Sequence, residues 1–131
     1  MKVDDAVKTD VYKHIKASEL ASAVTGVIRK TKRPRDSKKE DVVISVLSNF
    51  NGQIQVCTVN VNIYVADLVN KGQPEENSKR CRELSEIAAR VLEVFRGDNF
   101  RAVLESQHVY EVVGADEHVI NNRIEYKQLN E

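Results

Sequence analysis

The chain contains little of what defines several common protein classes. It has no tryptophan, two prolines, five glycines and two cysteines among 131 residues, and twenty basic residues balance twenty acidic ones. No Pro/Gly/Ser-rich stretch divides the sequence, so we expect residues 1–131 to form a single domain. Zero net charge excludes a global attraction to nucleic acid or to a membrane surface, and any electrostatic function must therefore be local.

Long apolar runs are also missing. The N-terminus lacks the apolar region of a secretory signal, and no uninterrupted apolar stretch approaches the roughly 20 residues that span a bilayer. We therefore expect a protein that is made and assembled in the cytoplasm, with no membrane partner.

No residue pattern signals a catalytic centre. Cys57 and Cys81 lack metal-ligand spacing, and we expect both to be core thiols that could face each other between sheet and helix. His14, His108 and His118 are scattered without zinc-ligand spacing, and the glycines form no phosphate-binding motif. We predict a protein that is not an enzyme and holds no cofactor or metal, and an enzyme with an unsignalled site is the least favoured alternative.

The strongest local pattern is a long β-hairpin. Residues 41–47 form one apolar strand, Asn51-Gly52 follows, and a longer alternating strand covers residues 53–65. Asn-Gly permits positive φ at both central positions of a turn, which makes it a strong hairpin signal between two apolar runs. On the second strand one face carries Cys57, Val59, Val61, Ile63 and Val65, and the other carries Thr58, Asn60, Asn62 and Tyr64. The sheet should therefore have one dry and one wet face.

Apolar spacing predicts helices before and after this hairpin. Val7, Val11 and Ile15 recur every four residues in a first helix that begins near Asp4. Ser18 should cap a second, short helical segment that Gly26 ends, before a short strand at Val27-Ile28. The longest helix is expected from Pro74, which suits a first helical position, to Arg96 and Gly97. Its apolar face consists of Cys81, Leu84, Ile87, Ala88, Val91, Leu92 and Phe95.

Two further strands complete the predicted fold. They run from Phe100 to Val113 and from His118 to Gln128. The expected faces are Ala102, Leu104, Ser106, His108 and Tyr110 on the first, and Ile120, Asn122, Ile124 and Tyr126 on the second. Their weaker alternation suits strands near an edge or in an oligomer interface. We predict an α+β fold of order α-β-β-β-α-β-β, in which an antiparallel sheet of four to five strands is packed on one face by the long helix plus the N-terminal helix.

One segment concentrates positive charge. Between residues 29 and 39 there is one acid, Asp36, and seven basic residues, namely Arg29, Lys30, Lys32, Arg33, Arg35, Lys38 and Lys39. Pro34 disfavours regular structure, so we expect a loop. Seven cations could neutralise several phosphates and bind nucleic acid without sequence preference. The alternatives are a solvated loop, or one that pairs with acids on a neighbouring subunit.

The order of elements resembles a known protein family. The residues that carry the resemblance are 11–15, 18–28, the Pro-containing loop from Lys32 to Ile44, and the return strand 59–65, followed by a helix and two strands. This pattern is similar to the tail-completion proteins of long-tailed bacteriophages, also called tail terminators or head–tail joining proteins, in a form found in prophage-like elements. The resemblance covers nearly the whole chain and involves no catalytic signature.

The resemblance implies a structural protein that caps the tail tube, stops its polymerisation and joins it to the head, commonly as a hexameric ring. The implied partners are further copies of the chain, tail-tube proteins and head-connector proteins. The implied locations are the host cytoplasm during assembly and the head–tail junction of the virion. The basic segment could face DNA in the lumen or an adjacent ring. The alternative function is a small, non-specific nucleic-acid-binding accessory protein that uses residues 29–39.

The tip of the long hairpin is the predicted subunit contact. It is formed by Phe50, Asn51 and Gly52, and the two strands that lead to it are longer than so small a domain needs. A protruding two-stranded ribbon is only marginally stable without a partner surface. We therefore expect the hairpin, together with the last two strands, to supply contacts between subunits.

Overall fold

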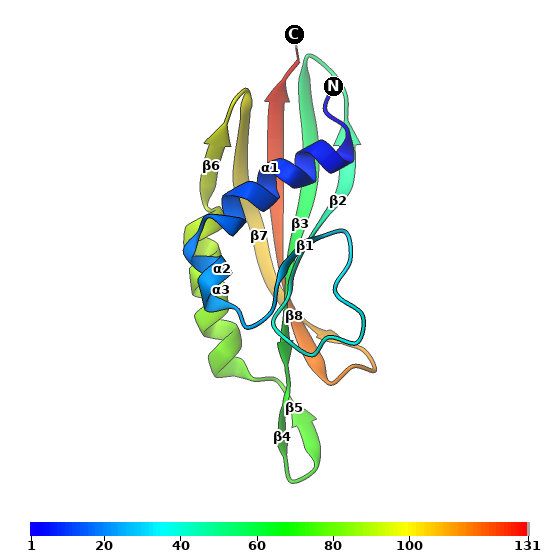
Figure 1. Cartoon of the computed structure of the whole chain (residues 1–131), viewed down its shortest axis with the longest axis vertical. Helices are drawn as coiled ribbons and strands as arrows, with labels where there is room; N and C mark the ends of the chain where they lie inside the picture. Colours follow the sequence, from blue (N-terminus) through cyan, green and yellow to red (C-terminus); the bar gives the residue numbers. More distant parts are fainter. Residues whose placement is uncertain (131) are drawn as a thin grey trace.

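A computed structural model describes residues 1–130. Its helices are α1 (Asp4–Lys16), α2 (Glu19–Ala23) and α3 (Ser78–Leu92). Its strands are β1 (Ile28–Lys30), β2 (Val42–Phe50), β3 (Ile54–Ala66), β4 (Leu68–Asn70), β5 (Gln73–Glu75), β6 (Val94–Gly97), β7 (Phe100–Val112) and β8 (Glu117–Leu129). Figure 1 shows an elongated molecule in which the helices lie on one face of a curled sheet. None of the helices within residues 1–130 has the length and apolar character needed to cross a bilayer.

The main sheet has six strands in the order β1-β2-β3-β8-β7-β6. The α+β class is confirmed, but the predicted antiparallel sheet of four to five strands is wrong in two respects. β1 pairs with β2 in parallel, which makes the sheet mixed, and β6 adds a strand at the opposite edge. The parallel pair forms because the chain after β1 loops back along the sheet before it enters β2, so that both strands run in the same direction.

The N-terminal helices agree with the sequence-based prediction. Val7, Val11 and Ile15 are fully buried in α1, and Ser18 accepts a hydrogen bond from the backbone N–H of Leu20 at the start of α2. The N-terminus is also tied to the sheet, because the Gln55 amide bonds both the N–H and the C=O of Lys2, at 2.8 and 2.6 Å.

The long helix is shorter than predicted at both ends. α3 begins at Ser78 with Asn77 as its N-cap, and the prediction of a start at Pro74 is wrong because Pro74 lies in β5, an exposed ribbon strand that tolerates a residue without an N–H. At its other end α3 stops at Leu92, because the chain turns into β6 and pairs with β7. Phe95 nevertheless reaches the core, from this strand.

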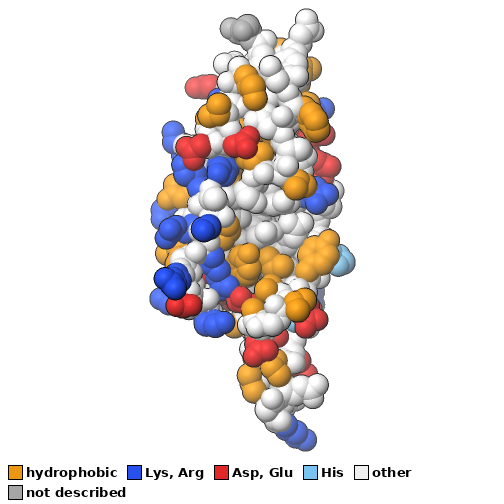
Figure 2. All heavy atoms as spheres, turned by 90° about the vertical axis from the view of Figure 1, so that its right-hand side faces the viewer, with side chains coloured by type: hydrophobic (Ala, Val, Ile, Leu, Met, Phe, Trp, Pro, Cys, Tyr) orange, Lys and Arg blue, Asp and Glu red, His pale blue; other side chains and the backbone are white. Residues whose placement is uncertain are grey.

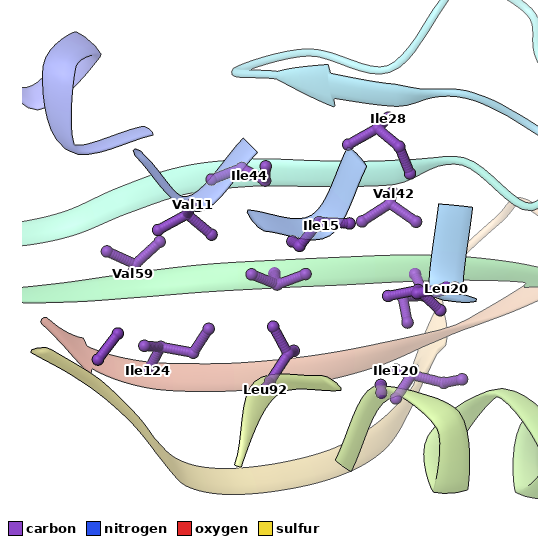
Figure 3. Close-up of a cluster of buried hydrophobic side chains, with 14 of the residues drawn as sticks. Val11, Ile15, Leu20, Ile28, Val42, Ile44, Val59, Leu92, Ile120 and Ile124 are labelled. Carbon is purple, nitrogen blue, oxygen red and sulfur yellow. The ribbon is translucent and has the colours of Figure 1, made fainter. Parts of the chain in front are cut away.

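The long helix and the N-terminal helix both cover one face of the sheet, as the sequence predicted. α1 contacts β1 and β2, and α3 contacts β7 and β8. In Figure 3, Val11 and Ile15 of α1 lie over β2 and β3, and Leu92 of α3 lies near Ile124 of β8. Both cysteines are buried free thiols in this core, and burial raises the pKa of Cys81 to about 11.

The two-residue hairpin turn lies between β4 and β5, and not at Asn51-Gly52 as the sequence predicted. Neither Asn51 nor Gly52 has a positive φ, and the connection from β2 to β3 is a three-residue loop in which the Asn130 side chain bonds Asn51 and the Gly52 carbonyl. Lys71 and Gly72 instead have φ of 53° and 79° between β4 and β5, as a type I′ hairpin turn requires. The predicted break before the long helix is therefore a second hairpin, which projects from the end of the molecule opposite both termini (Figure 1).

The last two strands also differ from expectation. The bounds are close to those predicted, and Ile120, Asn122, Ile124 and Tyr126 share a buried face of β8. However, β8 is central in the sheet, between β3 and β7, so its prediction as a strand near an edge is wrong. On β7 a bulge between Leu104 and Ser106 shifts the alternation, so Ala102 and Ser106 point to opposite faces.

Candidate functional site

The basic segment, residues 29–39, lies at the β1–β2 edge of the sheet. Arg29 and Lys30 belong to β1, which corrects the prediction that the whole segment is a loop, and the loop itself begins at Thr31. Thr31 has a φ of 76°, which is rare for a β-branched residue, and is held there by a bond from its N–H to the Ile44 carbonyl and one to its hydroxyl from Lys8. Figure 2 views this edge and shows Lys and Arg side chains gathered along one side of it.

Arg33 is not available to bind a ligand. Its guanidinium donates to Asp41 Oδ2 at 2.8 Å and to Glu117 Oε1 at 2.6 Å, and it lies 4.3 Å from the centre of the Tyr64 ring. A third bond, to the Lys39 carbonyl at 2.6 Å, fixes the end of the loop. The Arg33 cluster, formed by Arg33, Asp41, Tyr64 and Glu117, therefore fastens the basic segment across β3 to β8.

The electrostatics of this cluster favour its charged form. Burial alone would raise the pKa of Asp41, but hydrogen bonds from Ser37, Arg33 and the Val27 N–H more than offset it and hold that pKa below its ordinary value. Burial likewise acts to lower the pKa of Arg33, whereas its bonds to Glu117 and Asp41 raise it by more. Both groups are thus charged at neutral pH and act as a structural ion pair.

Five cations of the basic segment remain exposed. Lys30 bonds Thr9 and lies 3.2 Å from Asp5, which leaves Arg29, Lys32, Arg35, Lys38 and Lys39. Within residues 1–130 none of these five has an ion-pair partner. The part of the segment that can meet a ligand or partner is therefore smaller than its sequence suggested.

A second ion pair holds the chain just after the segment. Arg80 of α3 grips Glu40 with two bonds, Nε to Oε2 at 2.7 Å and Nη2 to Oε1 at 2.8 Å, and also donates to the Ala23 carbonyl at 2.7 Å. The Glu40 hydrogen bonds raise the pKa of Arg80. Since Thr25 N–H also donates to Glu40, this contact joins α2, the start of β2 and α3.

Gly26 is required by close packing in this region. Its N–H donates to the Glu40 carbonyl, and a Cβ on it would lie 2.3 Å from Asp41 Oδ1 and 2.7 Å from the Glu40 backbone. A Gly26→Ala variant should therefore lose about 1–3 kcal/mol of stability, as expected for overpacking against a rigid backbone. Urea denaturation would measure this, with Gly52→Ala at the open hairpin loop as the control, where the nearest atom is 3.3 Å away. Equal midpoints for both variants would contradict the packing role of Gly26.

The predicted contact residues lie at the opposite end of the sheet from the Arg33 cluster. Phe50 is 70% exposed, and on the same uncovered face Ile54 and its cross-strand neighbour Leu129 are also exposed. Leu47 is exposed at a β-bulge in β2. The hairpin end thus presents several apolar side chains together, and the basic segment lies at the other end of the sheet.

A His–Asp pair holds the base of the β4–β5 hairpin. His118 Nδ1 lies 2.6 Å from Asp67 Oδ1, and its Nε2 lies 3.8 Å from Glu76 Oε1. Asp67 N–H also donates to the Asp116 carbonyl. The sequence did not predict this contact, because the residues are separated by up to 51 positions. Among residues 1–130 no group of three or more His, Cys, Asp or Glu residues could hold a metal ion.

A hollow lies beside α1 and β6. It has a volume of about 440 Å³ and is lined by Lys2, Asp10, Lys13, His14, Arg96, Gly97, Asp98 and Phe100. Asp10 accepts a bond from the buried Tyr126 hydroxyl at 2.6 Å and pairs with Lys2. His14 stacks on Phe95 and bonds the Val91 carbonyl. Lys2, Asp10 and His14 are thus engaged in contacts that join α1 to the sheet and to α3.

Comparison with solved structures gives a match over nearly the whole chain. No protein-family model and no curated protein sequence match the chain. Among solved structures, a chain from the virion of a native gene transfer agent (GTA) particle superposes with a TM-score of 0.59, and the match covers 92% of each chain at 12% sequence identity. The two chains share a fold.

Proposed function

We propose that this chain is a structural protein of a phage or prophage virion, of the tail-completion type. The observation that carries the proposal is the fold shared with a chain of a phage-like particle over 92% of both chains. The element order from which the sequence resembles tail-completion proteins supports the same class. In this role the protein caps the tail tube and joins it to the head.

The exposed surface of the molecule is suited to binding other proteins. The apolar side chains Phe50, Ile54 and Leu129 are exposed together at one end, and the β4–β5 hairpin projects at the other with Leu68 and Val69 exposed. Apolar groups gathered in this way mark interaction sites more often than isolated ones. The proposed activity is therefore self-association and binding to tail-tube and head-connector proteins, without chemical turnover, in the host cytoplasm and then at the head–tail junction.

Electron microscopy of the protein with purified tail tubes tests this function. We expect density, in a ring, at one end of each tube, and tubes of defined length when the protein is present during assembly. Substituting Phe50→Ser should reduce tube-end occupancy, whereas Lys79→Ser on exposed α3 surface should not. Tubes that remain bare and of variable length at saturating protein would contradict the proposal.

The five unpaired cations favour a second candidate, non-specific nucleic-acid binding. If each contacts one phosphate, log K should fall with log salt with a slope of roughly −4.5 at most. Tyr64, the aromatic ring that contacts the segment through Arg33, is covered by that guanidinium and cannot stack on bases. Salt-sensitive DNA binding that Lys38→Glu and Lys39→Glu abolish, together with bare tail tubes, would favour this candidate.

A further inference from the structure

Two strands of the sheet, β2 and β7, have an outer edge that is paired over less than half of its length. β1 pairs with Val42–Ile44 of β2, so residues 45–50 have no strand on their outer side, away from β3. β6 pairs with Phe100–Val103 of β7, and beyond the bond from Leu104 N–H to the Glu93 carbonyl, residues 105–112 have none. Apart from the sheet partners β3 and β8, the one backbone bond to these two half-edges within residues 1–130 is the turn bond from Ala115 N–H to the Val112 carbonyl, at the very end of β7. Such open edges pair readily with another chain.

The two half-edges are complementary in direction and position. β2, β3, β8 and β7 are successively antiparallel, so β2 and β7 run in opposite directions. The unpaired edge of each strand lies in its C-terminal half. Because the two strands are antiparallel, the two unpaired edges lie at opposite ends of the sheet. A second copy in the same orientation, shifted along the strands by about six residues or roughly 20 Å, would place its β7 half-edge antiparallel beside the β2 half-edge.

Charge favours the same arrangement. In the shifted position β7 of the second copy ends where β1 of the first copy ends, so the turn after that β7 meets the start of the basic segment. No lysine or arginine occurs between Arg101 and Arg123, and Glu105, Glu111 and Asp116 are exposed there without an ion-pair partner in the described chain. Residues 29–39 carry a net charge of +6 from seven bases and one acid, and the rest of the neutral chain therefore carries −6.

We propose that copies of this chain associate head to tail, with residues 45–50 of β2 in one copy adding as a strand to residues 105–112 of β7 in the next. The cations that follow β1, above all Lys32 and Arg35, lie against Glu111 and Asp116 of the neighbour. Exposed apolar side chains, Leu47 and Phe50 on one copy and Tyr110 on the other, flank the new strand pair. The contact is heterologous, so it closes into a ring when the rotation between copies allows.

This interface deepens the proposed function and rests on it only in that both require self-association. An edge contact of six to eight residues is small, and we expect it to form at high protein concentration or on a tail tube. The partner of the basic segment is then a protein surface. The proposed function and the proposed interface can be disproved independently. Binding to tail tubes tests the function, and contacts between free copies test the interface.

Zero-length cross-linking tests the interface. Equal amounts of ¹⁴N- and ¹⁵N-labelled protein at millimolar concentration and low salt are treated with a carbodiimide, which joins lysine to carboxylate, and mixed-isotope peptides are identified by mass spectrometry. We expect links from Lys32, Lys38 or Lys39 to Glu111 or Asp116 between copies. No mixed-isotope links, or links confined to other residues, would overturn the proposal.

A charge swap gives the sharper test. Lys32→Glu with Arg35→Glu leaves Lys38 and Lys39 in place and should lower the yield of their links to Glu111 and Asp116 roughly tenfold. Glu111→Lys with Asp116→Asn removes both carboxylates that these links use, so this variant is tested in a mixture with the first. In the mixture the lysine introduced at position 111 should link to the glutamates introduced at positions 32 and 35, because each altered surface then faces its complement. Arg123→Glu with Lys127→Glu, on the open face of the central strand β8, is the matched control and should leave the yield unchanged. Thermal melts establish that each variant folds, and failure of the mixture to form these links would count against the interface.

Discussion

Val61→Asp should leave the protein largely unfolded at room temperature. Val61 is completely buried in β3, between Ile44 on β2 and Asn122 on β8, and faces the helices. An aspartate there would place a charge in the core without a partner. The expected loss exceeds about 4 kcal/mol, which is most of the stability of a domain with a typical free energy of unfolding of roughly 5–15 kcal/mol.

The neighbouring residue supplies a control that differs only in which face of the sheet it occupies. Asn60 lies on the uncovered face opposite Arg123. Asn60→Asp introduces the same side chain beside a cation, so we expect a change of less than about 1 kcal/mol. Circular dichroism and thermal melting would compare the two variants, with Leu84→Asp as a second core position on α3. Melts of Val61→Asp that match the parent would show that the core face has been assigned wrongly.

Arg33→Ala should cost about 3–5 kcal/mol, far more than loss of any other cation of the basic segment. Removing this guanidinium leaves Asp41 and Glu117 buried without their shared partner, and Glu117 Oε2 already lacks a hydrogen bond among the described residues. Arg35→Ala and Lys38→Ala remove exposed cations from the same loop and should change stability by less than about 0.5 kcal/mol. Urea denaturation at neutral pH measures the difference, and similar midpoints for all three variants would refute the structural role of Arg33.

The pH dependence of this effect has a definite sign. The pKa of Asp41 is lowered in the folded protein, so its contribution is fully present above the ordinary aspartate pKa of about 3.9 and is lost as pH falls through the lowered value. The Arg33→Ala variant lacks much of this contribution. The gap in stability between parent and variant should therefore be widest near neutral pH and shrink below about pH 4. A gap that is constant from pH 7 to 3 would assign the loss to packing on Tyr64 instead.

A compensated variant separates the charge effect from the loss of volume. Arg33→Met with Asp41→Asn and Glu117→Gln keeps most of the side-chain volume and removes all three charges. Replacing a whole buried ion cluster by neutral groups costs much less than removing one member. We therefore expect this triple variant to be more stable than Arg33→Ala, with stability measured by the same urea titration.

The amino-acid sequence by itself determined the local elements. The four-residue spacing of Val7, Val11 and Ile15, the Ser18 cap and the strict alternation from Cys57 to Val65 depend on neighbours within a few positions, and each formed as expected. It also located the apolar face of α3, although not its ends. These features follow from helical and strand periodicity, which acts within one element.

Tertiary structure decided everything that depends on partners far apart in the sequence. Pairing with β3 and β7 made β8 central, Asn130 shaped the β2–β3 loop, and Glu117, 84 positions away, converted Arg33 from a candidate ligand-binding cation into a buried structural one. Charge in the sequence shows how many cations a segment holds, but only the fold shows which of them are already neutralised. The open half-edges of β2 and β7 are likewise visible only once β1 and β6 are seen to be short, because a strand's free backbone groups are set by the length of its neighbour.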